Sequence, residues 1–177
     1  MDYSIFNWFN ALAGQKMWLD VLGIICSDFL IFSVPLIIVL VYFFSRRREK
    51  IIPVLLKIIF AFILTCLINY ALKGVVARPR PFVSHVGVYR LAKLFADLKD
   101  YSFPSNHTAA VFVMAIGVLF DWKKFGLILL IPATLVGLGR IFVGVHYPSD
   151  VLAGAAIALA ISWLTLFLFR DFRLGRR

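Results

Sequence analysis

Two histidines in this sequence stand beside residues that suit acid, base or nucleophilic chemistry. His146 is followed four residues later by Asp150, which is the spacing of a nucleophile or base that a carboxylate orients. His107 lies in the stretch SFPSNHTA, where a long apolar run begins, and a histidine there could give a proton to a leaving oxygen. The residues favour an acid and a nucleophile in one site, and by themselves they leave open which histidine attacks.

Basic side chains and a helix start complete a set that suits phosphate. Lys73, Arg80 and Arg140 supply positive charge and forked donors for phosphoryl oxygens, which carry spread negative charge in the transition state. Pro104 and Ser105 open a helix whose first amides have no partner inside the helix, and such a terminus attracts an anion. These are the residue types that phosphoryl transfer requires.

Each of these elements also has a purely structural explanation. Lys73 could be a long side chain that reaches from a helix end to the membrane surface. The PSNH stretch could be a capped helix start and nothing more. HYPSD could be a proline-initiated start in which Asp150 favours the dipole of the first turn. The catalytic interpretation therefore depends on whether the elements that carry these residues bring them together.

Those elements are expected to be membrane helices. The 177 residues are 62% hydrophobic with a mean hydropathy of +0.93, which excludes a water-soluble domain. We expect an all-α, polytopic membrane helix bundle with about five spans, forming a single membrane-embedded domain over residues 1–177. A short N-terminal helix over residues 5–13 is expected in the membrane interface. The predicted spans cover about residues 21–44, 51–72, 105–120, 125–142 and 151–169.

Consecutive spans run in opposite directions, and this decides where the polar groups lie. Lys73 follows the second span, residues 105–107 begin the third, Arg140 lies near the end of the fourth, and His146 and Asp150 precede the fifth. All of these positions fall at one boundary of the bilayer. A charge at the centre of a span costs about 2.5 to 3.5 kcal/mol on insertion scales, so charges gathered at one boundary favour a functional explanation.

The flanking basic residues predict the orientation. By the positive-inside rule the side on which they gather is the cytoplasm, so the candidate site faces the extracytoplasmic (periplasmic) side of the inner or plasma membrane and the C-terminus is cytoplasmic. The net charge of +10 is thus a topology signal, and no nucleic-acid partner is expected. The basic residues on the cytoplasmic side are Arg46, Arg47, Arg48, Lys50, Lys123, Lys124, Arg170, Arg173, Arg176 and Arg177.

Four other residues have no part in this set. Cys26 and Cys66 both lie inside apolar runs, where a free cysteine behaves as a small hydrophobe, so no disulfide is expected. Asp28 lies inside the first span, close to the outer surface, and the sequence assigns it no role. His85 has no partner at a comparable spacing and is expected in a loop.

Three stretches, KGVVARPRP, PSNH and GRIFVGVHYPSD, resemble the three signature motifs of the type 2 phosphatidic acid phosphatase family. That family shows Lys, six residues and Arg-Pro, then Pro-Ser-Gly-His, then Ser-Arg, five residues, His, three residues and Asp. The match is in type and spacing, with two departures. Asn106 stands where the family has Gly, and we expect Asn to tolerate a left-handed turn there. Gly139 stands where it has Ser, which removes a hydroxyl donor.

The resemblance implies a role for each matching residue. His146 would attack phosphorus and become a phosphohistidine, Asp150 would orient it, and His107 would protonate the leaving group. No metal and no other cofactor is implied. The residues implied to hold phosphoryl oxygens are Lys73, Arg80, Ser105 and Arg140, with the amide of Asn106 close to them.

A site at the bilayer boundary predicts a membrane lipid as substrate. The stretch LKDYSFPSNHTA most resembles bacterial undecaprenyl pyrophosphate phosphatases; a lipid A 1-phosphatase and a phosphatidylglycerophosphate or phosphatidic acid phosphatase remain alternatives. His85, Arg90, Lys93 and Lys99 either meet a second phosphate or form a solvated loop.

Two other classes of protein are alternatives to a phosphatase. A small anion transporter is the first, and the pair of His146 and Asp150 argues against it, because a passive anion path does not need such a pair. A metal-binding protein that uses the two histidines and Asp150 is the second. The neighbouring cations argue against it, because they would repel a divalent ion.

Overall fold

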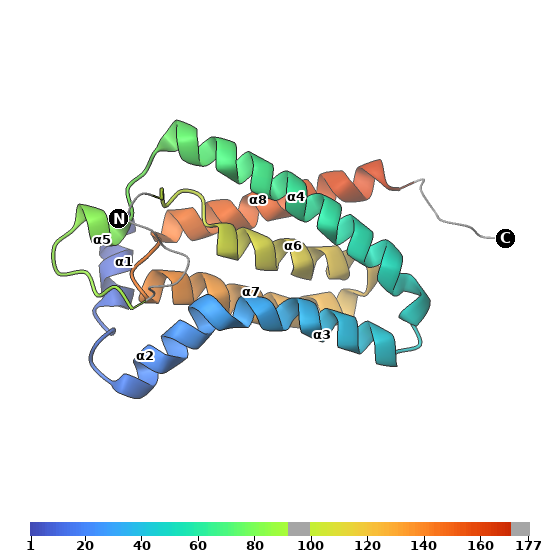
Figure 1. The fold of residues 1–177 in the computed structure, drawn as a ribbon, viewed down its shortest axis with the longest axis horizontal. Coiled ribbons are helices and arrows are strands. Elements are labelled where there is room, and N and C mark those ends of the chain that lie inside the picture. Colours follow the sequence, from blue (N-terminus) through green and yellow to red (C-terminus); the bar gives the residue numbers. More distant parts are fainter. Residues whose placement is uncertain (92–99, 171–177) are drawn as a thin grey trace.

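The computed structural model describes residues 1–91 and 100–170, and over these ranges the ordered elements are helices (Figure 1). The expected all-α membrane bundle is therefore confirmed. The elements are α1 (Asp2–Asn10), α2 (Met17–Ile24), the π-helix η1 (Ile25–Phe29), α3 (Leu30–Phe44), the 3₁₀ turn η2 (Arg48–Lys50), α4 (Ile51–Val76), α5 (Pro81–Ser84), α6 (Asn106–Asp121), α7 (Lys123–Phe142) and α8 (Pro148–Leu168).

Four segments of the described chain are long and apolar enough to cross a bilayer: Met17–Phe44, Arg48–Ser84, Lys123–Phe142 and Pro148–Leu168. The remaining expected span, α6, has 16 residues. At about 1.5 Å per residue it is shorter than the roughly 30 Å of a hydrocarbon core. It lies in the middle of the bundle against α4, α7 and α8 (Figure 1), so protein rather than lipid covers most of its surface.

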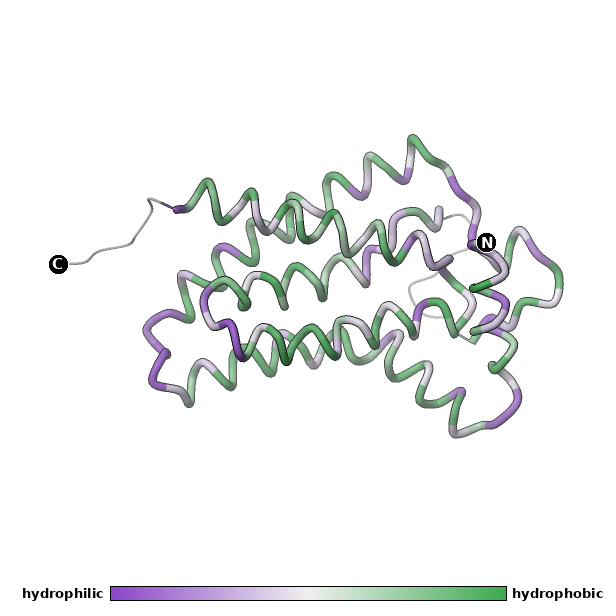
Figure 2. Tube along the Cα trace, turned by 180° about the vertical axis from the view of Figure 1, so that it is seen from behind, coloured by the Kyte–Doolittle hydropathy of each residue, from purple (hydrophilic) through white to green (hydrophobic). Residues whose placement is uncertain are grey.

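The interior of the bundle is built from small and branched apolar side chains. Val111 and Val113 of α6 are fully buried, as are Val34 of α3 and Val136 of α7. Large apolar side chains such as Phe32 remain exposed on the outer faces, as a lipid-facing surface requires. Figure 2 shows the same division, with hydrophobic residues along the helices and hydrophilic residues gathered towards the two ends.

The site end of the bundle is the end where α4 and α7 finish and α6 and α8 begin. The N-terminal helix α1, expected over residues 5–13, lies across this end. Phe6 is fully buried there and packs against Tyr147, with 5.7 Å between the ring centroids. The Asn10 side chain donates to the carbonyl oxygens of Phe142 at 2.8 Å and Tyr89 at 2.9 Å. These contacts fix α1 to the connections that carry the candidate site.

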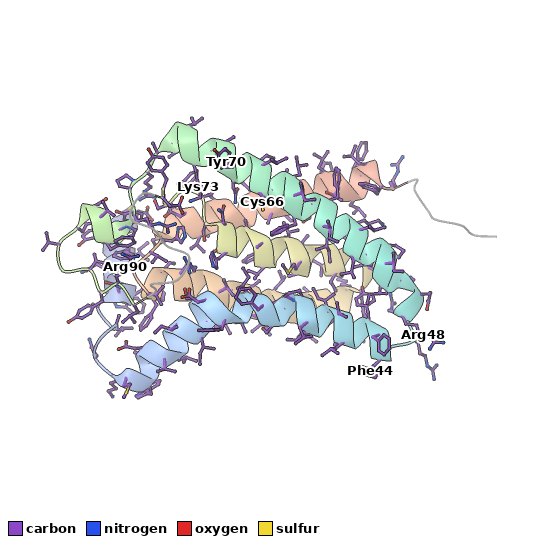
Figure 3. All side chains as sticks on the ribbon, in the orientation of Figure 1. Phe44, Arg48, Cys66, Tyr70, Lys73 and Arg90 are labelled. Atoms are coloured by element: carbon purple, nitrogen blue, oxygen red, sulfur yellow. The ribbon has the colours of Figure 1, made fainter. Side chains whose placement is uncertain are left out.

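Asp121 fastens the opposite end of the bundle. Its carboxylate accepts a hydrogen bond from the Tyr42 hydroxyl at 2.8 Å. Arg47 and Lys50, in the turn between α3 and α4, lie 3.5 and 3.8 Å from the same carboxylate. The turn between α3 and α4 is thereby tied to the turn between α6 and α7. Phe44 and Arg48 mark this end in Figure 3, away from Lys73 and Arg90 at the site end.

Candidate active site

The residues singled out by type and spacing gather at the site end, each held by a different element. Lys73 lies in the last turn of α4, and Arg80 is the residue before α5. Arg140 lies in the last turn of α7, and His146 follows in the connection to α8. The side chains of Lys73, Arg80, Ser105, Arg140, His146 and Asp150 are all buried. The antiparallel arrangement thus brings together groups that are far apart in the sequence.

His146 is held between a carboxylate and a guanidinium. Its Nδ1 lies 3.4 Å from Oδ2 of Asp150, and its Nε2 lies 3.3 Å from Nη1 of Arg80. Burial, together with the charges of Arg140, Arg80 and Lys73, holds the pKa of His146 well below its ordinary value. The imidazole is therefore neutral at physiological pH, and its Nε2 faces Arg80. A neutral ring nitrogen with a lone pair on that side is suited to attack an anion bound by the neighbouring cations.

Asp150 is fully buried and uses both carboxylate oxygens. Oδ2 accepts from the backbone N–H of Tyr147 at 2.8 Å, and Oδ1 accepts from Nη1 of Arg78 at 2.8 Å. The backbone carbonyl of Asp150 accepts from the N–H of Ser105 at 3.0 Å. A Cβ on Gly154 would lie 2.6 Å from the carbonyl oxygen of Ser105, so only glycine lets α8 approach the start of α6 this closely. The PSNH motif and the motif that ends at Asp150 are thus joined by a backbone hydrogen bond.

Arg78 was not singled out by the sequence, although ARPRP offers two arginines. It bridges Asp150 and Asp2, with its Nη2 lying 2.7 Å from Oδ2 of Asp2. The Asp2 carboxylate also accepts from the N–H and hydroxyl of Ser149, at 3.0 and 2.5 Å. The guanidinium carbon of Arg78 lies 3.7 Å from the centroid of the Tyr147 ring. The N-terminal helix thus reaches the carboxylate that faces His146.

Lys73 and Arg80 share one carboxylate, that of Asp100, which the sequence also did not single out. Oδ1 of Asp100 lies 3.4 Å from Nζ of Lys73, and Oδ2 lies 2.5 Å from Nη2 of Arg80. The ammonium of Lys73 also donates to the carbonyl of Tyr101. Burial raises the pKa of Asp100, but the charges of Lys73 and Arg80 outweigh it and the net shift is downward. The carboxylate of Asp100 is therefore already paired with both cations.

Arg140 is fully buried and pairs with Asp28, the residue to which the sequence assigned no role. Its Nη1 lies 2.6 Å from Oδ1 of Asp28 and donates to the hydroxyl of Ser27 at 3.0 Å. Its Nε and Nη2 have no hydrogen-bond partner among the residues that the structure describes. One edge of the guanidinium is thus fixed, and the other retains its donors.

At the start of α6, Ser105 is the N-cap residue. Its hydroxyl oxygen accepts from the N–H of Thr108 at 3.4 Å and from the Thr108 hydroxyl at 3.0 Å. His107 is the second residue of the helix and is partly exposed. The capped helix start expected as a structural alternative is therefore present, beside the buried cations of the site.

Asn106 is expected to tolerate a left-handed backbone, but its position in the structure does not require one. It is the first residue of α6, and among the described non-glycine residues the positive φ falls at Ala77 instead. The Oδ1 atom of Asn106 accepts a hydrogen bond from Nδ2 of Asn69 at 3.0 Å. The extra amide therefore ties the start of α6 to α4.

Of the four basic residues considered for a second phosphate, the structure describes His85 and Arg90. His85 lies in the loop after α5, as expected, and its ring stacks on Tyr3 with 3.8 Å between the ring centroids. The guanidinium carbon of Arg90 lies 4.3 Å from the centroid of the Phe82 ring. Lys93 and Lys99 lie outside the described residues.

Two cavities lie away from this cluster. One, of about 220 Å³, is apolar and lies between α1, α2 and α7, next to Cys26 and Gly139. The other, of about 340 Å³, lies at the opposite end near Lys50 and Asp121. Ligand sites are usually concave, but here Asp100 occupies the space between Lys73 and Arg80, so the chemistry of the side chains locates the site better than cavity size does.

Residues 54–173 match the PAP2 superfamily. The chain is 33% identical over 171 residues to undecaprenyl-diphosphatase BcrC of Bacillus subtilis, covering 97% of this chain and 85% of that protein. It is 34% identical over 113 residues to the lipid A 1-phosphatase of Rhizobium johnstonii, covering 62% of this chain and 46% of that protein. The crystal structure of LpxE from Aquifex aeolicus is similar with a TM-score of 0.72 and 29% identity, covering 94% of each chain.

The chain belongs to the PAP2 superfamily of membrane phosphatases. The resemblance carried by the three motifs is confirmed, and with it the class of enzyme, a lipid phosphatase.

Proposed function

We propose that this enzyme hydrolyses undecaprenyl pyrophosphate to undecaprenyl phosphate and inorganic phosphate. Similarity to undecaprenyl-diphosphatase BcrC over most of the chain supports the substrate. The observation that carries the chemistry is the placement of His146, whose Nδ1 faces Asp150 while its Nε2 faces Arg80. A site at the end of membrane helices meets a phosphate at headgroup depth, as a lipid substrate requires.

In the proposed reaction Nε2 of His146 attacks the terminal phosphorus. A bond from nitrogen to phosphorus forms as the bond from phosphorus to the bridging oxygen breaks, and the lipid phosphate leaves with a proton from His107. Water then attacks the phosphohistidine and gives its proton to His107, which releases inorganic phosphate and restores His146. Asp150 holds the imidazole and stabilises its positive charge. Lys73, Arg80, Arg140, Ser105 and Asn106 would hold the phosphoryl oxygens.

We propose that no divalent metal takes part. The three buried cations and the N-terminus of α6 supply the positive field that a metal would otherwise provide. Phosphate release should therefore continue in excess chelator, and orthovanadate, a mimic of five-coordinate phosphorus, should inhibit it. Activity that is lost in chelator and restored by one particular metal would contradict this part of the proposal.

The deciding experiment is release of inorganic phosphate by the purified protein from a panel of lipids. Undecaprenyl pyrophosphate should be the best substrate, ahead of lipid A, phosphatidylglycerophosphate and phosphatidic acid. Similarity to a lipid A 1-phosphatase and to LpxE makes lipid A the second candidate. A preference of about tenfold or more for lipid A in kcat/KM, which equals about 1.4 kcal/mol, would replace the proposed substrate with that one.

We further propose that the chain is a single domain in the inner or plasma membrane, with its site on the extracytoplasmic side. The basic residues near the opposite end support this orientation. In a variant without Cys26 and Cys66, a cysteine at exposed Val86 should react with an impermeant reagent from outside intact cells. A cysteine at exposed Glu49 should react only after the membrane is opened. The reverse result would invert the topology.

A further inference from the structure

Within the guanidinium of Arg140, one nitrogen is hydrogen-bonded to described residues and the other two are not. The side chain has no solvent exposure, and its hydrogen bonds to the described residues all involve Nη1, to Asp28 at 2.6 Å and to Ser27 at 3.0 Å. Nε and Nη2 have no partner among the residues described. A guanidinium carries five N–H donors in a fixed plane, so fixing one nitrogen fixes the direction of the others. The donors without a partner, Nε and Nη2, thus belong to Arg140, which is proposed to bind the phosphoryl group.

The two groups that fix Nη1 come from a rare backbone element. Ser27 and Asp28 lie in the π-helix η1, the widened turn between α2 and α3. The Ser27 hydroxyl donates to Oδ1 of Asp28 at 2.7 Å, and both side chains are buried. π-helical turns are rare and are frequently found at functional sites. Ser27 and Asp28 thus face Arg140 as one ordered unit.

Gly139 permits this contact between η1 and α7. A Cβ at this position would lie 2.8 Å from the backbone nitrogen of Ser27 and 3.1 Å from Cβ of Cys26. Because the nearest atom belongs to the backbone, a side chain at residue 139 would push η1 away from α7. The family motif places a serine hydroxyl next to this arginine, and here glycine stands in its place. The hydroxyl within hydrogen-bond distance of Arg140 instead comes from Ser27, on the neighbouring element.

We propose that Ser27 and Asp28 are positioning residues for phosphoryl transfer. They hold Arg140 so that Nε and Nη2 face the phosphoryl oxygens, and they replace the hydroxyl that is absent at residue 139. This inference rests on the proposed role of Arg140 in binding the phosphoryl group. Because the two residues act through Arg140 and do not touch substrate, their effect should be largest where the geometry of the phosphoryl group is most demanding, in the transition state.

The first test compares kinetics of Asp28→Asn with wild type, with Asp20→Asn as the matched control on the same helical rod. Among the described residues the Asp20 carboxylate accepts a local hydrogen bond, from the N–H of Gly14, and it lies apart from Arg140 in the bonding pattern. Asp28→Asn should lower kcat roughly 10- to 100-fold with little change in KM, because a small misplacement of a positioning group costs up to about 10² in rate. Asp20→Asn should leave both constants unchanged. A rise in KM with kcat intact would contradict positioning.

The second test is whether the effect passes through Arg140. In an Arg140→Ala background, Asp28→Asn should change kcat by less than about twofold, since residues in one network are not additive. Full additivity of the two losses would overturn the inference. Ser27→Ala, which keeps the counter-charge for Arg140, should lower kcat less than Asp28→Asn does. If Asp28→Asn does not fold, Ser27→Ala still tests whether this pair of residues positions Arg140.

The third test needs no turnover. Orthovanadate resembles the five-coordinate transition state, whereas inorganic phosphate resembles the product. Asp28→Asn and Gly139→Ala should weaken vanadate binding at least severalfold more than phosphate binding, whereas Gly74→Ala, at a glycine with open space around it, should change neither. Equal weakening of both anions would refute the inference. If the wild-type protein binds vanadate but cleaves none of the lipids, the proposed function fails and the positioning role remains testable by this comparison.

Discussion

Oδ2 of Asp100 lies 2.5 Å from Nη2 of Arg80, so the protein places its own carboxylate where a phosphoryl oxygen is proposed to bind. The same carboxylate reaches Lys73 through its other oxygen. A substrate phosphate therefore competes with Asp100 for these two cations.

Asp100→Asn should therefore strengthen the binding of anions. The side chain of Asp100 is 43% exposed, so its pairing is screened, and an exposed pair is worth about 0.2 to 1 kcal/mol. We expect KM for the lipid and the inhibition constant for inorganic phosphate to fall by about two- to fivefold, with kcat nearly unchanged. Steady-state kinetics with competing phosphate measure both. A higher KM in this variant would mean that Asp100 helps to build the site instead of occupying it.

The two histidines should separate by leaving group. His146→Ala should lose turnover on every substrate, because no phosphohistidine can form without the attacking nitrogen. His107→Ala should depend on the substrate, since general acid assistance is worth roughly 10² to 10⁴ in rate when the departing oxygen leaves poorly. A lipid monophosphate expels an alkoxide, whereas a lipid pyrophosphate expels a phosphate monoester with a second pKa of about 6.

His107→Ala should thus retain more of its rate on undecaprenyl pyrophosphate than on phosphatidic acid. The measurement is phosphate release from both lipids at saturating concentration, with chemistry shown to limit the rate. Equal proportional losses of rate on the two lipids would argue against His107 as the acid. An active His146→Ala enzyme would show that His146 is not the nucleophile.

Arg78 should matter because it holds Asp150 from the side opposite His146. Arg78→Gln removes the ion pairs to Asp150 and Asp2, and we expect kcat to fall about tenfold or more, with partial recovery in Arg78→Lys. Asp2→Asn should have a smaller effect that nearly vanishes in the Arg78→Gln background. Arg48→Gln, an exposed arginine at the opposite end, is the control. If Arg78→Gln leaves kcat unchanged, Asp150 does not need this support.

Stability should fall in mild acid because of His146. Its pKa in the folded protein lies well below its ordinary value, so the unfolded chain binds a proton that the folded chain does not. Stability from this group is complete above about pH 6.5 and is lost as the pH falls below that value, by at most about 1.4 kcal/mol per pH unit. Thermal midpoints in detergent between pH 7.5 and 5 should show this decline. His146→Gln should flatten it, and an unchanged slope would contradict a buried neutral imidazole.

The sequence by itself determined the class of this protein and the end of the bundle where the candidate site lies. Hydrophobicity along the chain fixes which segments enter a bilayer, and the alternation of spans then places Lys73, Arg140 and His146 at one boundary. These are local properties, readable from composition, length and spacing. The predicted spans were accordingly confirmed as helices, with ends that moved by a few residues. The exception in length is α6, which can be short because the neighbouring helices surround it.

Only the tertiary structure decided which charge meets which. Asp28 and Arg140 are 112 residues apart, and Arg78 and Asp150 are 72 apart, so no spacing rule connects them. Their pairing depends on how closely two helices approach and which faces they turn to each other. For Arg140 and Asp28, Gly139 permits that approach by lacking a Cβ, and the buried cation then requires the carboxylate that the packing brings to it.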